Sequence, residues 1–253
     1  MKVVILAGGL GTRLAPMTTV LPKPMVEIGD MPILIHIMRW YAKFGFDEFV
    51  IALGFKGDVI KRYMVDRGSL GGHVKVDFKT GAVESHGSPG IDWRVELVDT
   101  GLEAKTGARL RKLRHCLDGT FMLSYGDGIA DIDIKALLNF HRRHGRLATL
   151  TAVRPLARFG HLECEGDRVR RFNEKPQLGE GWINGGFFVI EPEVLETIPE
   201  GEDVSLEIDV LGRLAAQGEL MAFRHTTFWH CMDTVRDLNV LETMWRSGEA
   251  PWA

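Results

Sequence analysis

The sequence predicts an α/β protein with a doubly wound sheet, and three features of the first 65 residues favour that fold. Val3 to Ala7 is a short apolar run that ends at glycines, as a buried parallel strand does. Residues 32–44 repeat apolar side chains at helical spacing, and Pro32 suits a first helical turn. Residues 48–53 then predict a second strand and residues 58–65 a short helix. This alternation predicts ligand binding at the carboxyl ends of the strands.

The rest of the chain continues the alternation of strands and helices, but from about residue 159 the predicted strands become short. We expect short strands and an exposed loop within residues 66–89. Further strands are expected at 95–98, 120–125, 148–153, 160–164, 168–172, 183–190 and 220–223. Further helices are expected at 108–115, 132–144, 206–217 and 234–246. Because no repeat, linker or clean boundary interrupts this order, we expect a single domain over residues 1–253.

Composition narrows the class of protein. Of the 253 residues 45% are apolar and 26% charged, which is ordinary for a globular protein. A net charge of −3 lacks the basic excess of a nucleic-acid binder. No apolar run reaches the roughly 18 residues that span a bilayer. The three cysteines form no C-x-x-C pair, so we expect reduced thiols and a cytoplasmic protein without nucleic-acid or membrane partners.

A glycine-rich loop directly follows the first strand. It comprises Gly8, Gly9 and Gly11 and ends in Thr12 and Arg13. Glycines let backbone N–H groups approach phosphate oxygens, and Arg13 adds a positive charge. A dinucleotide fingerprint would need a third glycine where Leu14 stands, and the Gly-Lys-Ser/Thr of a P-loop is absent. The loop therefore indicates phosphate binding of another type, and a simple tight turn is the alternative.

Lys23 lies between Pro22 and Pro24. The two prolines predict a stiff, extended, non-helical loop that presents the ammonium group. A rigidly placed ammonium suits a polyphosphate whose charge rises as a bond to phosphorus breaks.

Two aspartates are candidate metal ligands. Asp127 follows an apolar strand between two glycines, and a carboxylate at such a strand end suits Mg²⁺ beside a phosphate loop. A Gly-Asp-Gly turn is the alternative. Asp233 follows another predicted strand, but its side chain could equally cap the helix that begins near Thr234.

Residues 3–25 resemble the signature of the sugar-1-phosphate nucleotidylyltransferases, with its G-G-x-G-T-R-L and P-K-P-M elements. The resemblance continues nearly to the end of the chain, through residues 125–128, 172–176, 183–187 and 229–237. Within the family the chain is most similar to the cytidylyl branch, which uses CTP. That similarity is carried by Asp99-Thr100-Gly101, Thr106 to Leu110, Tyr125 to Gly128 and Gly248 to Trp252.

The resemblance implies a Rossmann-like, doubly wound mixed sheet of the nucleotide-diphospho-sugar transferase type, with a small β-rich elaboration on the sugar side. It implies a mainly nucleotide-binding half, residues 1–150, and a mainly sugar-phosphate-binding half, residues 151–253. The implied reaction transfers a cytidylyl group from CTP to α-D-glucose 1-phosphate and gives CDP-glucose and pyrophosphate, with Mg²⁺ as cofactor. It also implies a homo-oligomer, of which a hexamer is one form, and a role in deoxysugar or polysaccharide assembly.

The resemblance also assigns roles to residues of this chain. The catalytic residues are Arg13, Lys23 and Asp127, and the metal ligands are Asp127 and Asp233. The expected sugar-phosphate contacts are Glu174, Lys175, Asn184 and Gly185. The expected nucleotide contacts are Leu6, Ala7, Gly8, Gly9, Gly11, Thr12, Arg13, Lys23, Thr106, Arg109 and Gly126.

One segment departs from the resemblance. Residues 205–211 differ from the Trp-Glu-x-Glu-Pro-Leu texture associated with enzymes that make CDP-glucose, and this segment is expected near the sugar. The same chemistry with another sugar 1-phosphate, or with UTP or dTTP, therefore stays open. A non-catalytic regulatory relative is a further alternative, although Lys23, Asp127, Lys175 and Asp233 are all present.

Overall fold

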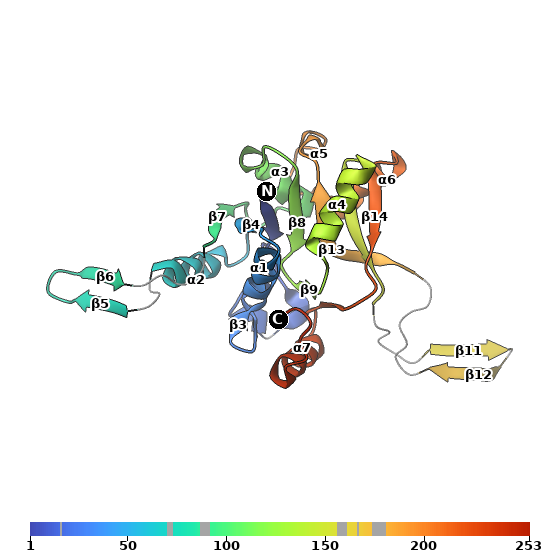
Figure 1. Cartoon of the computed structure of the whole chain (residues 1–253), viewed down its shortest axis with the longest axis horizontal. Coiled ribbons are helices and arrows are strands. Elements are labelled where there is room, and N and C mark those ends of the chain that lie inside the picture. The colour runs from blue at the N-terminus through green and yellow to red at the C-terminus, as the bar shows by residue number, and fades with distance from the viewer. Residues whose placement is uncertain (16, 70–72, 87–91, 156–160, 166, 174–180) are drawn as a thin grey trace.

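The computed structural model describes residues 1–15, 17–69, 73–86, 92–155, 161–165, 167–173 and 181–253. At its centre lies a seven-stranded sheet with the strand order β14-β10-β13-β8-β1-β4-β7 (Figure 1). β13 is antiparallel to β8 and β10, whereas the other pairings in this sheet are parallel. Its strands are β1 (Val3–Leu6), β4 (Glu48–Leu53), β7 (Arg94–Asp99), β8 (Phe121–Tyr125), β10 (Ala148–Val153), β13 (Ile183–Ile190) and β14 (Leu220–Arg224). The predicted doubly wound mixed sheet is confirmed.

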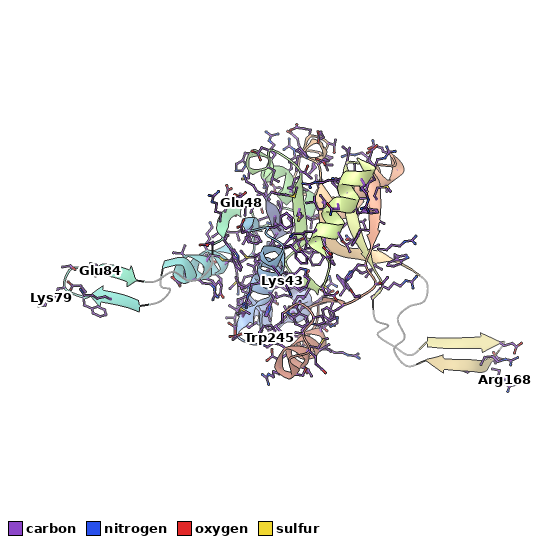
Figure 2. The ribbon with its side chains drawn as sticks, in the orientation of Figure 1. Lys43, Glu48, Lys79, Glu84, Arg168 and Trp245 are labelled. Atoms are coloured by element: carbon purple, nitrogen blue, oxygen red, sulfur yellow. The ribbon has the colours of Figure 1, made fainter. Side chains whose placement is uncertain are left out.

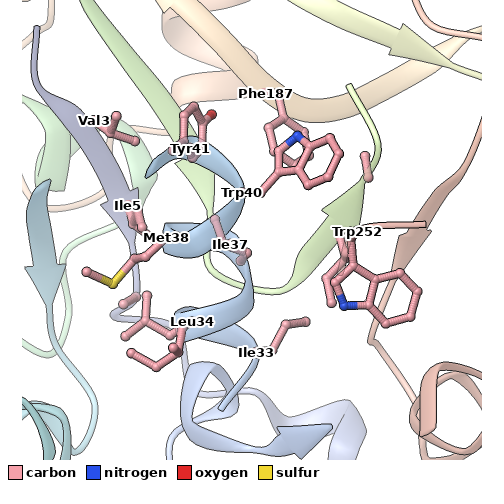
Figure 3. Close-up of a cluster of buried hydrophobic side chains, with 14 of the residues drawn as sticks. Val3, Ile5, Ile33, Leu34, Ile37, Met38, Trp40, Tyr41, Phe187 and Trp252 are labelled. Carbon is pink, nitrogen blue, oxygen red and sulfur yellow. The ribbon is translucent and has the colours of Figure 1, made fainter. Parts of the chain in front are cut away.

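Helices cover both faces of this sheet because successive side chains of a strand point to opposite sides. Val3 and Ile5 of β1 join one buried cluster, and Val4 and Leu6 join the other. Figure 3 shows the first cluster, where Ile37 and Tyr41 of α1 pack over β1. The first face carries α1 (Ile33–Lys43), α2 (Gly57–Ser69), α4 (Ile134–His144) and α7 (Val235–Ser247). The second carries α3 (Thr106–Lys112), α5 (Glu193–Glu196), the π-helix η5 (Leu206–Leu211) and α6 (Gly212–Ala216).

Short elements complete the fold, and some of them differ from expectation. The predicted helix at 206–217 begins as the π-helix η5 and continues as α6. The predicted helix at 108–115 is α3 followed by a 3-10 turn, η4 (Arg114–Cys116). The 3-10 turns η1 (Thr12–Leu14) and η2 (Met17–Thr19) follow the glycine loop. Small strand pairs are formed by β2 (Glu27–Ile28) with β3 (Met31–Pro32), and by β9 (Gly128–Ala130) with β15 (Trp229–Cys231).

The prediction that the prolines exclude a helix at Lys23 is wrong. Lys23 begins a single 3-10 turn, η3 (Lys23–Met25), which Pro22 precedes in an extended conformation. Pro24 is tolerated there because the first helical turn does not use its missing N–H. The turn buries Lys23, which is 9% exposed, and directs its ammonium group at defined partners.

Two hairpins extend from the body toward opposite ends of its long axis (Figure 1). One pairs β5 (His73–Asp77) with β6 (Ala82–His86), and the other pairs β11 (His161–Glu165) with β12 (Arg168–Asn173). Lys79 and Glu84 mark the first and Arg168 the second in Figure 2. The second hairpin is the β-rich elaboration that the resemblance implied. No helix among the described residues is both long and apolar enough to cross a bilayer.

Candidate active site

A cleft of about 1500 Å³ opens where the central strands β1 and β8 end. β1 and β8 end there and lead into Gly8 and Asp127, and the antiparallel β13 begins there with Asn184 beside its first residue. After β1 the chain adds β4 and β7 on one side and then returns to place β8 on the other. The cleft therefore lies at a topological switch point, where open α/β sheets bind ligands.

The structure gathers most of the predicted site residues in this cleft. Its walls include Leu6, Ala7, Gly8, Gly9, Gly11, Thr12, Arg13, Lys23, Thr106, Arg109, Gly126, Asp127, Asn184 and Asp233. Gly185 lies beside it, and its carbonyl accepts a hydrogen bond from the indole Nε1 of Trp229 at 2.7 Å. Glu174 and Lys175 lie outside the described residues.

The backbone of the glycine loop requires glycine at two positions. A Cβ at Gly8 would lie 2.3 Å from the Cζ of Arg109, so a larger residue would force the Arg109 side chain out of its position. Gly11 has a φ of 64°, in the left-handed region that disfavours a Cβ. The Gly11 carbonyl accepts bonds from the Leu14 N–H and from the Thr18 hydroxyl, each at 3.0 Å. These contacts hold the loop in a tight curve at the mouth of the cleft.

Arg109 supports this loop from behind. Its side chain is 4% exposed, and burial lowers the pKa of its guanidinium despite the nearby Glu202 and Asp99. The acceptors of its hydrogen bonds, at 2.7–3.1 Å, are the carbonyls of Gly8, Leu53, Gly101 and Leu102 and the hydroxyl of Thr100. Its planar fork thus ties three loops together, which a lysine could not do. In this structure its N–H groups donate to protein oxygens, so Arg109 shapes this side of the cleft by holding the backbone.

Four charged groups converge in the cleft. The Lys23 Nζ lies 2.6 Å from an oxygen of Asp127 and 2.6 Å from an oxygen of Asp233. The Arg13 guanidinium lies 3.0 Å from the other oxygen of Asp233. Burial disfavours the charged Lys23, but the Asp127 charge and the hydrogen bonds to both aspartates outweigh it and raise the pKa of Lys23. The ammonium therefore stays charged at neutral pH.

The structure settles the alternative for Asp233. The cap of α7 is Thr234, whose hydroxyl accepts from the Asp237 N–H while the Asp237 carboxylate accepts from the Thr234 N–H. This capping box leaves the Asp233 carboxylate facing Lys23 and Arg13. Asp233 is therefore a cleft residue and not a helix cap.

The two aspartates fit a divalent cation. Oxygens of Asp127 and Asp233 and the sulfur of Cys231 all lie within 4.8 Å of one another. Carboxylate oxygens are the ligands that Mg²⁺ prefers. The ammonium of Lys23 already lies between the two carboxylates, so this position attracts positive charge.

Tyr125, Ser205 and Glu207 also line the cleft. They lie in segments that the sequence singled out, but none of the three was predicted as a site residue. The Glu207 carboxylate accepts hydrogen bonds from Thr106 at 2.8 Å, from Tyr125 at 2.5 Å and from Ser205 at 2.7 Å. The Tyr125 hydroxyl also accepts from the Asn184 amide at 3.2 Å. Glu207 thus links a predicted nucleotide residue to a predicted sugar residue.

These bonds lower the pKa of Glu207. Burial alone would raise the pKa of this carboxyl group, but the hydrogen bonds from Tyr125, Ser205 and Thr106 outweigh burial and hold the pKa below its ordinary value. Burial and the Glu207 charge raise the pKa of Tyr125. Glu207 is therefore an anion and Tyr125 a neutral hydroxyl at neutral pH. The departure of residues 205–211 from the expected texture was the sequence signal that could have identified Glu207.

A phosphate-type glycine loop, two basic groups and two carboxylates at the switch point define an α/β protein that binds phosphorylated ligands. Comparison with known proteins agrees. Residues 2–240 match the nucleotidyl transferase family. The chain is 48% identical to a glucose-1-phosphate cytidylyltransferase of Salmonella typhi, over 100% of this chain and 98% of that protein. It is 38% identical to a probable glucose-1-phosphate cytidylyltransferase of Bacillus subtilis, over 100% of this chain and 99% of that protein.

A solved structure shows the same fold. HddC from Yersinia pseudotuberculosis, complexed with GMP-PN, superposes with a TM-score of 0.72 over 96% of this chain and 99% of its own, at 24% identity. The chain belongs to the nucleotidyl transferase family. Members of this family generally need a divalent metal ion, which agrees with the paired carboxylates of Asp127 and Asp233.

Proposed function

We propose that this protein transfers a cytidylyl group from CTP to α-D-glucose 1-phosphate and releases CDP-glucose and pyrophosphate. Similarity to cytidylyltransferases over the full chain supports the choice of substrates. The observation that carries the chemistry is the convergence of Lys23 and Arg13 on Asp127 and Asp233. The two basic groups could bind a triphosphate, and the two carboxylates beside them could bind its metal counter-ion.

The nucleotide end is the source of charge stabilisation. The N–H groups of the glycine loop and the guanidinium of Arg13, which is 76% exposed, would hold the triphosphate. Lys23 would donate hydrogen bonds to the oxygens on which charge grows as the bond to pyrophosphate breaks. Leu6, Ala7, Thr12, Thr106 and Gly126 would line the nucleotide.

The sugar end supplies the nucleophile. A sugar-1-phosphate oxygen attacks the α-phosphorus of CTP in line with the departing pyrophosphate. Because that phosphate is already an anion near pH 7, no general base is required, and orientation carries the rate. Lys175 would aim the attacking phosphate, and Glu174, Asn184 and Gly185 would bind sugar hydroxyls.

Asp127 and Asp233 would hold Mg²⁺, which neutralises the phosphate charge of the nucleotide and of the leaving group. This assignment of Mg²⁺ is supported by an oxygen-rich pair of ligands at the strand end.

We further propose separate binding roles for the two halves of the chain, an oligomeric state and a cellular location. Residues 1–150 would mainly bind the nucleotide and residues 151–253 mainly the sugar phosphate. Both halves contribute strands to one sheet, so they would act as a single domain. The protein would work in the cytoplasm as a homo-oligomer, in the assembly of deoxysugars or polysaccharides.

The decisive experiment measures pyrophosphate release with Mg²⁺ and glucose 1-phosphate, separately with CTP, UTP, dTTP, ATP and GTP. Release with CTP alone is expected. Release with another nucleotide would keep the mechanism and change the base specificity. If all five reactions are silent, the same plate with other hexose or heptose 1-phosphates decides between another sugar and a non-catalytic relative.

A further inference from the structure

Cys231 stands apart from the groups that the proposed reaction uses. It ends β15 and pairs with Gly128 of β9, the residue after Asp127. The Met232 N–H donates to the Asp127 carbonyl at 2.9 Å, which holds the two segments together. The backbone around Cys231 is therefore hydrogen-bonded to the segment that contains Asp127.

Cys231 and Asp233 both line the cleft, whereas Met232 between them is fully buried in the core. The result is the set of three donor atoms within 4.8 Å: the sulfur of Cys231 and oxygens of Asp127 and Asp233.

The chemistry of these donors favours different metals. Mg²⁺ takes oxygen ligands almost exclusively and gains nothing from a thiol. Zn²⁺ and Cd²⁺ bind thiolate strongly, and a set of one thiolate with two carboxylates suits them better than two carboxylates alone.

We propose that Cys231 makes the Asp127–Asp233 centre a binding site for thiophilic divalent cations, which compete there with the oxygen-ligated metal. On binding, the S–H bond breaks, the proton passes to solvent, and a metal–thiolate bond forms. Occupation draws Asp127 and Asp233 onto the thiophilic ion and blocks turnover. The effect on turnover rests on the proposed function, whereas the binding rests on the cluster alone.

A second cluster offers a built-in comparison. Glu96 of β7 with His115 and Cys116 of η4 also has one donor atom from each residue within 4.8 Å. There the Cys116 thiol donates to Glu96 at 3.1 Å. Burial raises the pKa of both the Cys116 and the Cys231 thiol, so the two clusters differ in their donor atoms and not in the direction of that shift. Because this cluster lies outside the cleft walls, a Cys116→Ser variant controls for a thiol that binds metal without touching the site.

The test titrates the full chain with Cd²⁺ and follows the ultraviolet charge-transfer absorption of a cadmium–thiolate bond. All proteins carry Cys164→Ser, every variant also carries Cys116→Ser, and circular dichroism checks that each is folded. The parent and Cys116→Ser are both expected to bind Cd²⁺ in the cleft with this absorption. Cys231→Ser and Cys231→Ala are expected to lose the absorption and weaken binding on the order of 10- to 100-fold.

The Asp127→Asn variant distinguishes a Cd²⁺ site formed by Cys231 together with the aspartates from binding by the Cys231 thiol alone. It is expected to keep the absorption while weakening Cd²⁺ on the order of tenfold or more. Unchanged affinity in Asp127→Asn, an unchanged absorption in Cys231→Ser, or its loss in Cys116→Ser would each overturn the proposal. In the activity arm, Cd²⁺ should inhibit the parent at concentrations that spare Cys231→Ala. If the parent turns over no substrate, the binding arm still decides the proposal.

Discussion

The two ends of the cleft are built in different ways. The proposed nucleotide end is made by short contiguous segments, the glycine loop at 8–13 and the turn at Lys23, which follow or face strand ends. The proposed sugar end depends on contacts across the chain, because Glu207 of η5 accepts hydrogen bonds from Tyr125 at the end of β8 and from Thr106 of α3, which belongs to the proposed nucleotide side. The first end holds formal charges in direct contact, and the second a hydrogen-bond network around one carboxylate.

This contrast predicts that catalysis and substrate selectivity can be changed separately. Charge neutralisation acts on the transition state, so changes at the nucleotide end should lower kcat. Orientation of hydroxyl groups acts on bound substrate, so changes at the sugar end should mainly raise KM. Four variants challenge this contrast, beginning with the largest expected effect.

Lys23→Ala should lower kcat on the order of 10²-fold or more, because it removes the ammonium that meets the growing phosphate charge. Pyrophosphate release under saturating substrates measures it. Lys43→Ala is the matched control, since Lys43 lies on α1 and bonds a carbonyl at the chain end instead of the cleft. Unchanged turnover in Lys23→Ala would remove Lys23 from the mechanism.

Gly8→Ala should lower the free energy of unfolding by about 1–3 kcal/mol, because the added methyl overlaps the Arg109 guanidinium and disturbs its carbonyl bonds. Thermal unfolding compares it with Gly9→Ala, where no described heavy atom lies within 4 Å of the added Cβ. Gly9→Ala should stay within about 0.5 kcal/mol of the parent. Equal losses of unfolding free energy in Gly8→Ala and Gly9→Ala would show that the hydrogen bonds of Arg109 to the glycine loop contribute little to stability.

Glu207→Ala should raise the KM for the sugar phosphate about tenfold while kcat changes less, since Tyr125 and Asn184 lose their alignment. Steady-state kinetics with each substrate varied in turn measures the split. Ile208→Ala, on the same π-helix and 78% exposed, should match the parent. A fall in kcat at constant KM would contradict the contrast between the two ends.

Glu207 should also contribute a small dependence of stability on pH. Its pKa is below its ordinary value in the folded protein, so the unfolded chain takes up its proton first as the pH falls. The stabilisation is complete above the unfolded value and is lost as the pH falls below it through the folded pKa. Denaturant unfolding should show the parent losing its advantage over Glu207→Gln across that range. A constant difference would mean that the folded pKa is ordinary.

The parallel strands and the glycine loop could be predicted because their signals are local. Val3 to Leu6 is apolar and ends at glycine, and residues 48–53 match β4 at both ends. Lys23 was predicted in an extended loop because proline rules describe helix interiors, whereas the first turn of a 3-10 helix accepts Pro24.

The sugar end could not be predicted in the same way. Thr106 and Glu207 meet across a hundred residues of chain, and no local pattern encodes that contact. The apolar periodicity of residues 206–217 predicted one uniform helix, whereas the structure begins it with the π-helix η5, which packs against α3. The supporting role of Arg109 depends on carbonyl groups from three loops, which only the folded backbone brings together.

Lys23 and Arg13 form ion pairs with Asp127 and Asp233 inside the cleft. The two positive and two negative charges therefore neutralise one another while no ligand is bound. A polyanion that recruits Lys23 leaves two carboxylates in need of a cation, and a cation on the carboxylates releases Lys23 for a polyanion. Nucleotide and divalent cation should therefore bind with positive cooperativity, and thermodynamic linkage makes that coupling equal in both directions.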